Sequence, residues 1–189
     1  MSSTDPGIQY LLSLKDKSRF EKMTRTAALL TGKLEEADVL PIVVGGLAVE
    51  IYTRGQYTTL DIDLVTQRRD LAGEILRDLG FSKEGRHWYH SELEVAIEIP
   101  ASKLEDADPE KVTRLELPDG LHINVIGIED IIMDRLRTCV HWKSFSDCEW
   151  GLRMLKTHSE LVDLPYLRKM AADDCEDSLQ LMLEWIAEL

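Results

Sequence analysis

The chain has 189 residues, of which 44% are hydrophobic and 30% are charged, a composition typical of a soluble globular protein. Its formal net charge of −13 argues against a general DNA- or RNA-coating protein, because such proteins neutralise phosphates with a basic surface. The sequence has no apolar run long enough to span a membrane and no signal-peptide pattern at its N-terminus. We therefore expect a cytoplasmic protein without a membrane partner.

Three cysteines are present, Cys139, Cys148 and Cys175. Their odd number and the lack of any Cys-x-x-Cys pair argue against both a disulfide framework and a zinc ribbon. We expect them to be buried thiols. Cys139 and His141 stand close in sequence, but metal sites need more ligands at defined spacings, so packing is the favoured explanation.

The first predicted elements are a loosely attached arm over 1–17 and an amphipathic helix from Ser18 to about Asp38. A short buried strand over 42–44 follows, then Gly45-Gly46, a helix over 47–52 and a second strand over 59–65. This unit of strand, glycine turn, helix and strand is the most informative part of the sequence.

In the strand over 59–65, alternation places Leu60, Ile62 and Leu64 on one face. Asp61 and Asp63 share the other face, with Cα atoms roughly 6.5–7 Å apart. Two carboxylates at this spacing suit a hard cation such as Mg²⁺. Gly45 and Gly46 lack Cβ atoms and precede a helix, so their backbone N–H groups can approach a phosphate closely. Alone, either feature is more often an ordinary turn or a solvated strand edge.

Together, Gly45-Gly46 and Asp61-x-Asp63 resemble the motif of the nucleotidyltransferase superfamily, the polymerase-beta-like fold. In that superfamily the glycine turn holds the triphosphate and the aspartate pair holds the metals. The resemblance implies an α+β fold, a mixed sheet with flanking helices followed by a small C-terminal helical bundle. We expect these parts to be an α/β domain over 18–127 and a helical subdomain over 128–189.

The remaining elements fit this division. A helix ending at Gly80, a hairpin over 81–90, an alternating strand over 93–99, an acidic loop over 101–111 and a second hairpin over 112–126 complete the first part. On the 93–99 strand Glu94 and Glu98 share one face. They lie roughly 13 Å apart, so only one can join the metal site, and we expect Glu98, at the C-terminal end of the strand, to be the third metal ligand.

Four amphipathic helices are expected after Gly127. Arg135 falls within an apolar stripe, so it is either part of a structural ion pair or a cation directed at nucleotide phosphates. Ser144 and Asp147 fit a helix N-cap, which by itself explains them. This region also resembles AbiEii-type toxins and related small bacterial nucleotidyltransferases, in which Arg135 takes the position of a lysine and Asp147 that of an aspartate. An arginine can bind phosphate but cannot accept a proton.

The resemblance implies a metal-dependent nucleotidyltransferase. Asp61, Asp63 and Glu98 would hold Mg²⁺ or Mn²⁺, and Gly45, Gly46, Arg135 and Asp147 would bind a nucleoside triphosphate, with Arg135 also acting in catalysis. The acceptor would be an RNA such as tRNA, or a protein hydroxyl, in a toxin-antitoxin context with a cognate partner. Two alternatives stay open: a catalytically inactive binding or antitoxin-like protein of this fold, and a sugar transferase that uses Asp-x-Asp, for which so short a chain offers no nucleotide-binding domain before the motif.

Overall fold

The computed structural model describes residues 5–189. The helices are α1 Pro6–Leu12, α2 Arg19–Glu35, α3 Gly45–Tyr52, α4 Arg69–Asp78, α5 Ile128–Trp142, α6 Phe145–Thr157, α7 Leu164–Asp174 and α8 Glu176–Ala187, with a 3-10 turn at Pro109–Lys111. The strands are β1 Ile42–Val44, β2 Asp61–Val65, β3 Ser82–Glu84, β4 His87–His90, β5 Val95–Glu98, β6 Thr113–Glu116 and β7 His122–Val125.

All of these strands form one seven-stranded sheet in the order β3-β4-β5-β2-β1-β7-β6. β2 pairs with β5 and β1 with β7 in parallel, while the other neighbours are antiparallel. Both hairpins lie at sheet edges, where short local connections favour antiparallel pairing. The mixed sheet and its flanking helices confirm the predicted α+β class.

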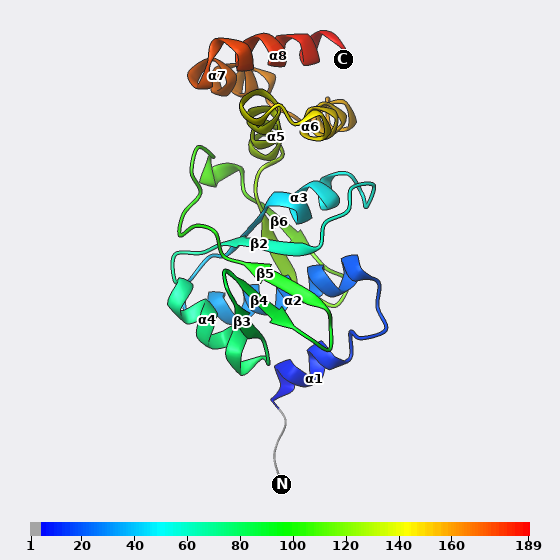
Figure 1. Ribbon diagram of the computed structural model, residues 1–189, viewed down its shortest axis with the longest axis vertical. Coiled ribbons are helices and arrows are strands. Elements are labelled where there is room, and N and C mark those ends of the chain that lie inside the picture. Colours follow the sequence, from blue (N-terminus) through cyan, green and yellow to red (C-terminus); the bar gives the residue numbers. More distant parts are fainter. Residues whose placement is uncertain (1–4) are drawn as a thin grey trace.

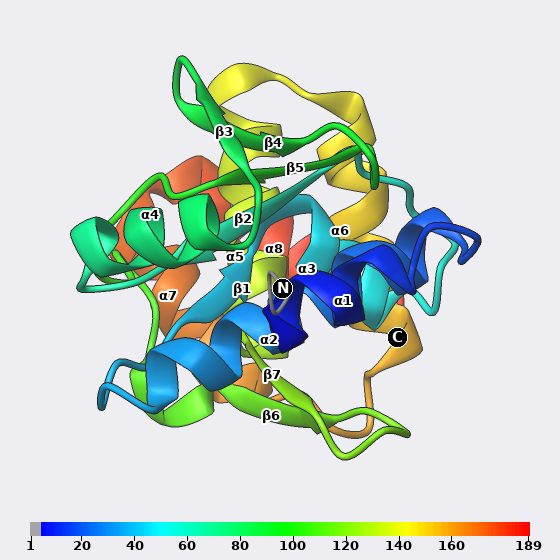
Figure 2. The ribbon, with the colours of Figure 1, turned by 90° about the horizontal axis from the view of Figure 1, so that it is seen from below.

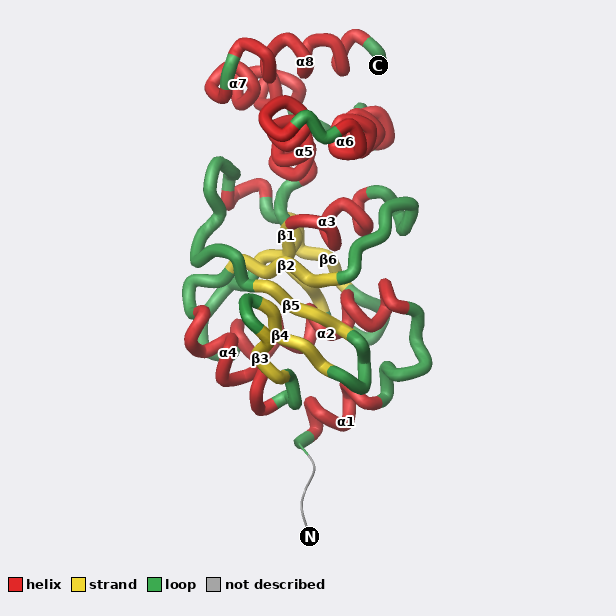
Figure 3. The backbone as a smooth tube through the Cα atoms, in the orientation of Figure 1, coloured by secondary structure: helices red, strands yellow, loops and turns green. Residues whose placement is uncertain are grey.

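Helices cover both faces of the sheet (Figures 1 and 2). α2 and α4 pack on one face, and α3 lies on the other, between the sheet and α5. The tube view shows α5, α6, α7 and α8 gathered at one end of the molecule, beyond the strands (Figure 3). A continuous core of buried residues runs from α1 through the sheet to Trp185 in α8.

Helix α2 illustrates how local sequence directs this packing. Ser18 is its N-cap and accepts a hydrogen bond from the Glu21 N–H at 3.2 Å. Its apolar stripe, including Met23, Leu30 and Leu34, is almost completely buried against the sheet. The predicted helix is thus confirmed, although it ends a few residues before Asp38.

The prediction of a loosely attached N-terminal arm is wrong for the described residues. Asp5 caps α1 by accepting a hydrogen bond from the Gly7 N–H at 2.7 Å, and Leu11 and Leu14 are 0% and 3% exposed. Burial of two leucines stabilises such a segment by about 3–5 kcal/mol before the entropy of ordering it is subtracted. Residues 1–4, which also belong to the predicted arm, lie outside the described part of the chain.

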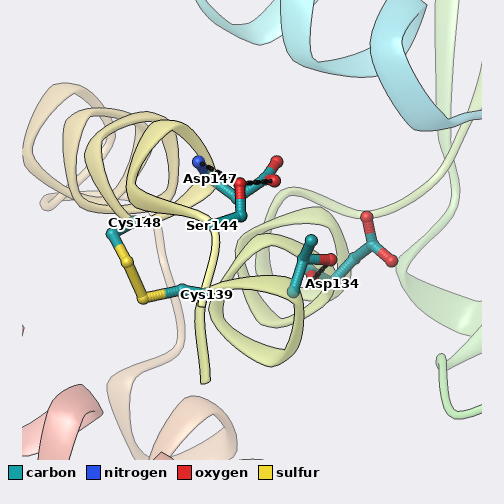
Figure 4. Close-up of a disulfide and its surroundings, with 6 residues drawn as sticks. Asp134, Cys139, Ser144, Asp147 and Cys148 are labelled. Carbon is teal, nitrogen blue, oxygen red and sulfur yellow. Dashed lines mark hydrogen bonds between the residues drawn. A yellow bond between two sulfur atoms is a disulfide. The ribbon is translucent and has the colours of Figure 1, made fainter. Parts of the chain in front are cut away.

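The cysteine prediction is wrong for two of the three residues. Cys139 near the end of α5 and Cys148 in the first turn of α6 form a disulfide, with Cα atoms 4.9 Å apart (Figure 4). The turn between the helices folds α6 back along α5, which brings together cysteines that are nine positions apart. Cys175 is a free, partly buried thiol. Within residues 5–189, none of the helices is both long and apolar enough to span a membrane.

Candidate functional site

Four side chains lie in one row across neighbouring strands of the sheet. The register pairs Val44 of β1 with Asp63 of β2, Asp63 with Glu98 of β5, and Glu98 with His87 of β4. Side chains that are directly opposite each other in adjacent strands point to the same face of a sheet. The row therefore places two carboxylates and an imidazole next to each other, on the face covered by α3.

Asp61 extends this row into a cluster. A carboxylate oxygen of Asp61, Nε2 of His87 and a carboxylate oxygen of Glu98 all lie within 4.8 Å of one another. His87 Nε2 is 3.2 Å from Glu98 Oε2 and 4.0 Å from Asp61 Oδ2. All three side chains are partly exposed, so the cluster opens to solvent and a ligand could reach it.

The strand that carries the aspartates starts later than the sequence predicts. β2 begins at Asp61, and Leu60 is 75% exposed, although the alternating pattern places it on the same face as Ile62 and Leu64, which are buried. The Thr59 hydroxyl donates a hydrogen bond to Asp61 Oδ1 at 3.1 Å, and the buried Glu50 accepts one from the Thr59 N–H at 3.2 Å. These bonds hold the residues before β2 away from strand pairing and orient the Asp61 carboxylate.

Gly45 and Gly46 lie so close to Asp63 and Thr59 that neither position has room for a side chain. Gly45 has φ +58°, and a Cβ added there would lie 2.8 Å from Cγ of Asp63 and closer still to its Oδ2. A Cβ on Gly46 would lie 2.7 Å from Cβ of Thr59. Any side chain at either position would push α3 away from the aspartates. The glycine turn and the strand that carries the aspartates are therefore in direct contact, and the absence of side chains on the glycines makes this contact possible.

The start of α3 also provides backbone donors that its N-cap residue does not engage. Its N-cap, Val44, has no side chain that can accept a hydrogen bond, so the first N–H groups are left to other partners. Gly46 donates a backbone hydrogen bond that opposes the rise in the pKa of Asp63. The positive end of the helix dipole therefore faces the acidic cluster, an arrangement that favours anions such as carboxylate and phosphate.

The charge state of Asp63 reflects crowding of acids. Burial, together with repulsion from Asp61 and Glu98, raises the pKa of Asp63 to about 6. The Gly46 N–H and the Arg135 guanidinium oppose this rise only in part. Three carboxylates crowded together in this way are stabilised by a bound cation.

The structure separates Glu98 from Glu94. β5 begins at Val95, so Glu94 precedes the strand, is exposed and has the positive φ of +56° that is typical of a turn. Glu98 lies beside Asp63 with a side chain that is 15% exposed. Its Oε2 also lies 3.3 Å from Nε of Arg86 in the turn between β3 and β4. Of the two glutamates, only Glu98 joins the cluster.

Arg135 is buried in an ion pair, as one of the two interpretations of its sequence position predicts. Its guanidinium donates to Asp147 Oδ1 at 2.7 Å and to Asp134 Oδ2 at 2.6 Å, and its side chain is 15% exposed. Ser144 caps α6: its hydroxyl accepts a hydrogen bond from the Asp147 N–H at 3.4 Å and donates one to the Asp147 carboxylate (Figure 4). The predicted capping role of Ser144 is thus confirmed.

Arg135 nevertheless reaches the acidic cluster. It borders a hollow of about 290 Å³ that the glycine turn, β2 and the loop after β5 also line. The lining residues are Val44, Gly45, Asp63, Val65, Pro100, Ala101, Lys103, Leu104, Glu105, Ile126, Ile131, Asp134 and Arg135. Asp147 is not among them, so it acts on this space only through Arg135.

Two residues of the site were missed by sequence analysis, His87 and Arg86. Both belong to the predicted hairpin over 81–90, but the pairing of its second strand with β5 is a tertiary contact. The available signal was the alternation of β4, in which Trp88 and His90 are buried and His87 faces the other side. Without the β5 register, that pattern could not indicate which residue His87 faces.

Comparison with known proteins adds support from structure alone. No protein-family model and no curated protein sequence matches the chain. Among solved structures it is similar to an antigenic nucleotidyltransferase-like protein from Paracoccidioides brasiliensis, with a TM-score of 0.59 and 12% identity over 89% of this chain and 88% of that one.

It is also similar to the antibiotic-resistance factor ANT(2'')-Ia, in a solution structure and in a crystal structure with adenylyl-2''-tobramycin. Both have a TM-score of 0.50 and 15% identity; they cover 88% and 84% of this chain, respectively, and 94% of the neighbour in each case. The chain therefore has a nucleotidyltransferase-like fold, as the resemblance implies. At these identities, the similarity establishes the fold and not the activity.

Proposed function

We propose that the protein is a metal-dependent nucleotidyltransferase that transfers a nucleoside monophosphate from a nucleoside triphosphate to an acceptor hydroxyl. The observation that carries the proposal is the convergence of Asp61, Asp63 and Glu98 beside the Gly45-Gly46 turn. Each half of this arrangement has an ordinary structural explanation by itself. The close contact of Gly45 with Asp63, which both line one hollow, fits a site for a cation and a polyphosphate.

The residues present fit Mg²⁺ or Mn²⁺. Both are hard cations that prefer carboxylate oxygens. The pKa of Asp63 is raised by burial and by repulsion from Asp61 and Glu98, and such a cation would balance that repulsion. Asp61, Asp63 and Glu98 would hold the ions. The ligand atoms of Asp61 and Glu98 lie together with that of His87, and Asp63 lies beside Glu98 in the sheet. When bound, the ions would neutralise the triphosphate and favour attack by the acceptor oxygen.

The remaining residues would position the nucleotide. The N–H groups at the start of α3 other than that of Gly46, which donates to Asp63, can donate to phosphate oxygens, since the N-cap residue Val44 offers no side-chain acceptor. Arg135 is held by Asp134 and Asp147 at the border of the hollow, where a phosphate could share its donors. Asp147 would then fix the direction of the guanidinium without touching the nucleotide. Arg135 stays protonated, so it binds charge and does not carry protons.

For the acceptor we propose an RNA such as tRNA, or a protein hydroxyl, with a role in a toxin-antitoxin pair. The cations available to such an acceptor at the helical end include Arg135, Arg137, Lys143, Arg153 and Lys156, although acids outnumber cations there and several of these cations are engaged in ion pairs. Arg135 pairs with Asp147, Arg137 with Asp174 and Lys156 with Glu188. A polyanionic acceptor would therefore compete with internal acids, and its binding should weaken steeply with salt.

The test is transfer from each labelled nucleoside triphosphate, with Mg²⁺, to total RNA or to a protein lysate. We expect label to enter one acceptor class only when metal is present. Asp61→Asn and Asp63→Asn should each reduce transfer by at least about 100-fold, because each removes a ligand of the metal ions that would neutralise the triphosphate. Asp78→Asn, at an exposed position of α4, is the matched control and should retain wild-type transfer.

A second readout does not require the acceptor. Mg²⁺ with the correct nucleotide should raise the melting temperature, since a ligand that binds only the folded state stabilises it. Equal shifts in the wild type and in both aspartate variants would contradict the proposed site. A shift that both variants lose, without transfer to either acceptor class, would favour a nucleotide-binding protein that is not catalytic.

A further inference from the structure

A second group of ligand-type side chains lies in the helical end, away from the sheet. His141 is in the last turn of α5, Asp174 is the last residue of α7, and Cys175 links α7 to α8. One ligand atom of each residue, an imidazole nitrogen, a carboxylate oxygen and a sulfur, lies within 4.8 Å of the other two. The nucleotidyl transfer proposed above uses none of them.

We propose that His141, Asp174 and Cys175 form a site for a transition-metal ion, with Zn²⁺ as the ion bound. Zinc binds nitrogen, carboxylate oxygen and thiolate sulfur with tetrahedral geometry. From the usual bond lengths, tetrahedral ligands would be separated by roughly 3.4 Å for nitrogen to oxygen and roughly 3.6 Å for sulfur to oxygen. Here His141 Nε2 is 2.9 Å and Cys175 Sγ is 3.6 Å from Asp174 Oδ2. Of these two separations, the nitrogen-to-oxygen distance must widen by about half an ångström for zinc to bind, and the sulfur-to-oxygen distance already fits.

The charges of the site also suit this ion. An ionised Asp174 and a Cys175 thiolate together neutralise the two positive charges of Zn²⁺, while His141 contributes a neutral nitrogen.

The sulfur lies at a helix start that favours negative charge. Cys175 is the N-cap of α8, a helix of 12 residues, and its Sγ accepts a hydrogen bond from the Ser178 N–H at 3.4 Å. The positive end of the helix dipole therefore points toward the sulfur. This position is unlike those of Cys139 and Cys148, which are bonded to each other and cannot bind metal in that state.

Neighbouring groups hold the ligands in place, as the second layer of a metal site does. The buried Ser178 hydroxyl donates to Asp174 Oδ2, and Arg137 Nε lies 3.4 Å from the other oxygen, Oδ1. The Asp174 side chain is 16% exposed and that of His141 is 41% exposed. The carboxylate is thus fixed, while the imidazole side of the site is open to solvent. Three protein ligands leave a fourth position for water.

Binding would join three helices. α5 supplies His141, α7 supplies Asp174, and Cys175 begins α8, so the ion would tie the end of α5 to the α7–α8 junction. An ion that binds only this arrangement adds its binding free energy to the stability of the folded state. Zinc binding here does not depend on the proposed nucleotidyl transfer, because it involves different residues.

The first test measures Zn²⁺ affinity by competition with a chromophoric chelator on the metal-free full chain. The background is Asp61→Asn, which weakens the cluster on the sheet as a second zinc site. We expect one bound equivalent. Cys175→Ser and His141→Gln should each weaken it by more than about 100-fold, and Ser178→Ala by about 10- to 100-fold. Unchanged affinity in Cys175→Ser and His141→Gln would overturn the proposal.

A spectroscopic test guards against variants that fail to fold. Co²⁺ bound to a thiolate gives a sulfur-to-metal charge-transfer absorption. The double variant Cys139→Ser, Cys148→Ser leaves Cys175 as the only thiol of the chain. We expect this absorption in the double variant, and Zn²⁺ should abolish it by displacing Co²⁺. A double variant that retains its circular dichroism but gives no such absorption would also overturn the proposal.

Discussion

At the sheet end of the molecule, Asp61, Asp63 and Glu98 lie beside one another, and their mutual repulsion helps to raise the pKa of Asp63 to about 6. At the helical end, acids instead lie against cations: Asp147 pairs with Arg135, and Asp174 pairs with Arg137. The first arrangement costs free energy in the isolated protein, and the second stabilises it. Acids that are held together without neutralisation thus indicate a ligand-binding function, whereas the pairing of Asp147 with Arg135 needs only a structural explanation.

The largest effect should come from the acid that the sheet register brings to the site. Glu98→Gln should reduce metal-dependent transfer by at least about 100-fold, because it removes a metal ligand next to Asp63. Glu94→Gln is the matched control, four residues earlier and exposed, and should change transfer by less than about twofold. Loss of activity in Glu94→Gln with retention in Glu98→Gln would show that β5 is misplaced in register.

A second prediction concerns loss of the ion pair between Arg135 and Asp147, which is largely buried. Arg135→Met removes the partner of Asp147, whose side chain is 18% exposed, and should lower the free energy of unfolding by about 2–4 kcal/mol. Chemical denaturation of Arg135→Met, Asp147→Asn and the double variant measures this. The double variant should lose less than the sum of the single losses, because neither charge is then left unpaired. If the losses in the free energy of unfolding of the two single variants add up to that of the double variant, the interaction between Arg135 and Asp147 does not contribute to stability.

The disulfide offers a third test of the helical end. Cys139→Ser should lower the free energy of unfolding by about 2–3 kcal/mol relative to the oxidised wild type, since the short loop between the cysteines is no longer closed in the unfolded chain. Denaturation of the wild type with a dithiol reductant should reproduce that loss. If reduction leaves the wild type unchanged, the bridge does not contribute to its stability.

The smallest effect concerns pH and the sheet end. Since the pKa of Asp63 rises from 3.8 in the unfolded chain to about 6 in the folded one, its ionisation destabilises the metal-free fold as pH rises through this range. Asp63→Asn should therefore be as stable as the wild type near pH 3.5 and more stable by about 2 kcal/mol above pH 7. Urea denaturation in a chelator at several pH values measures this difference. A difference that does not vary with pH would mean that Asp63 titrates normally.

Much of the site could be predicted because its parts lie close together in the sequence. Gly45-Gly46 and Asp61-x-Asp63 are separated by one short helix, so a local pattern was enough to identify them. Glu98 was chosen over Glu94 from the end of the strand on which it stands, and the pairing of Asp63 with Glu98 agrees with that choice. His87 and Arg86 could not be found in this way, since their place beside Glu98 depends on the pairing of β4 with β5.

By itself, the sequence determined the periodic elements, the burial of their apolar faces and the grouping of two aspartates on one side of a strand, because alternation and helical repeat are local properties of the backbone. Tertiary structure decided what lies between elements. Cys139 and Cys148 became a disulfide only because α6 folds back along α5. Leu11 and Leu14 are buried only because they pack into the hydrophobic core that the sheet and its helices form. Cys175 gained His141 as a neighbour only when α5 packed against the α7–α8 junction, a contact between distant parts of the chain that no local pattern encodes.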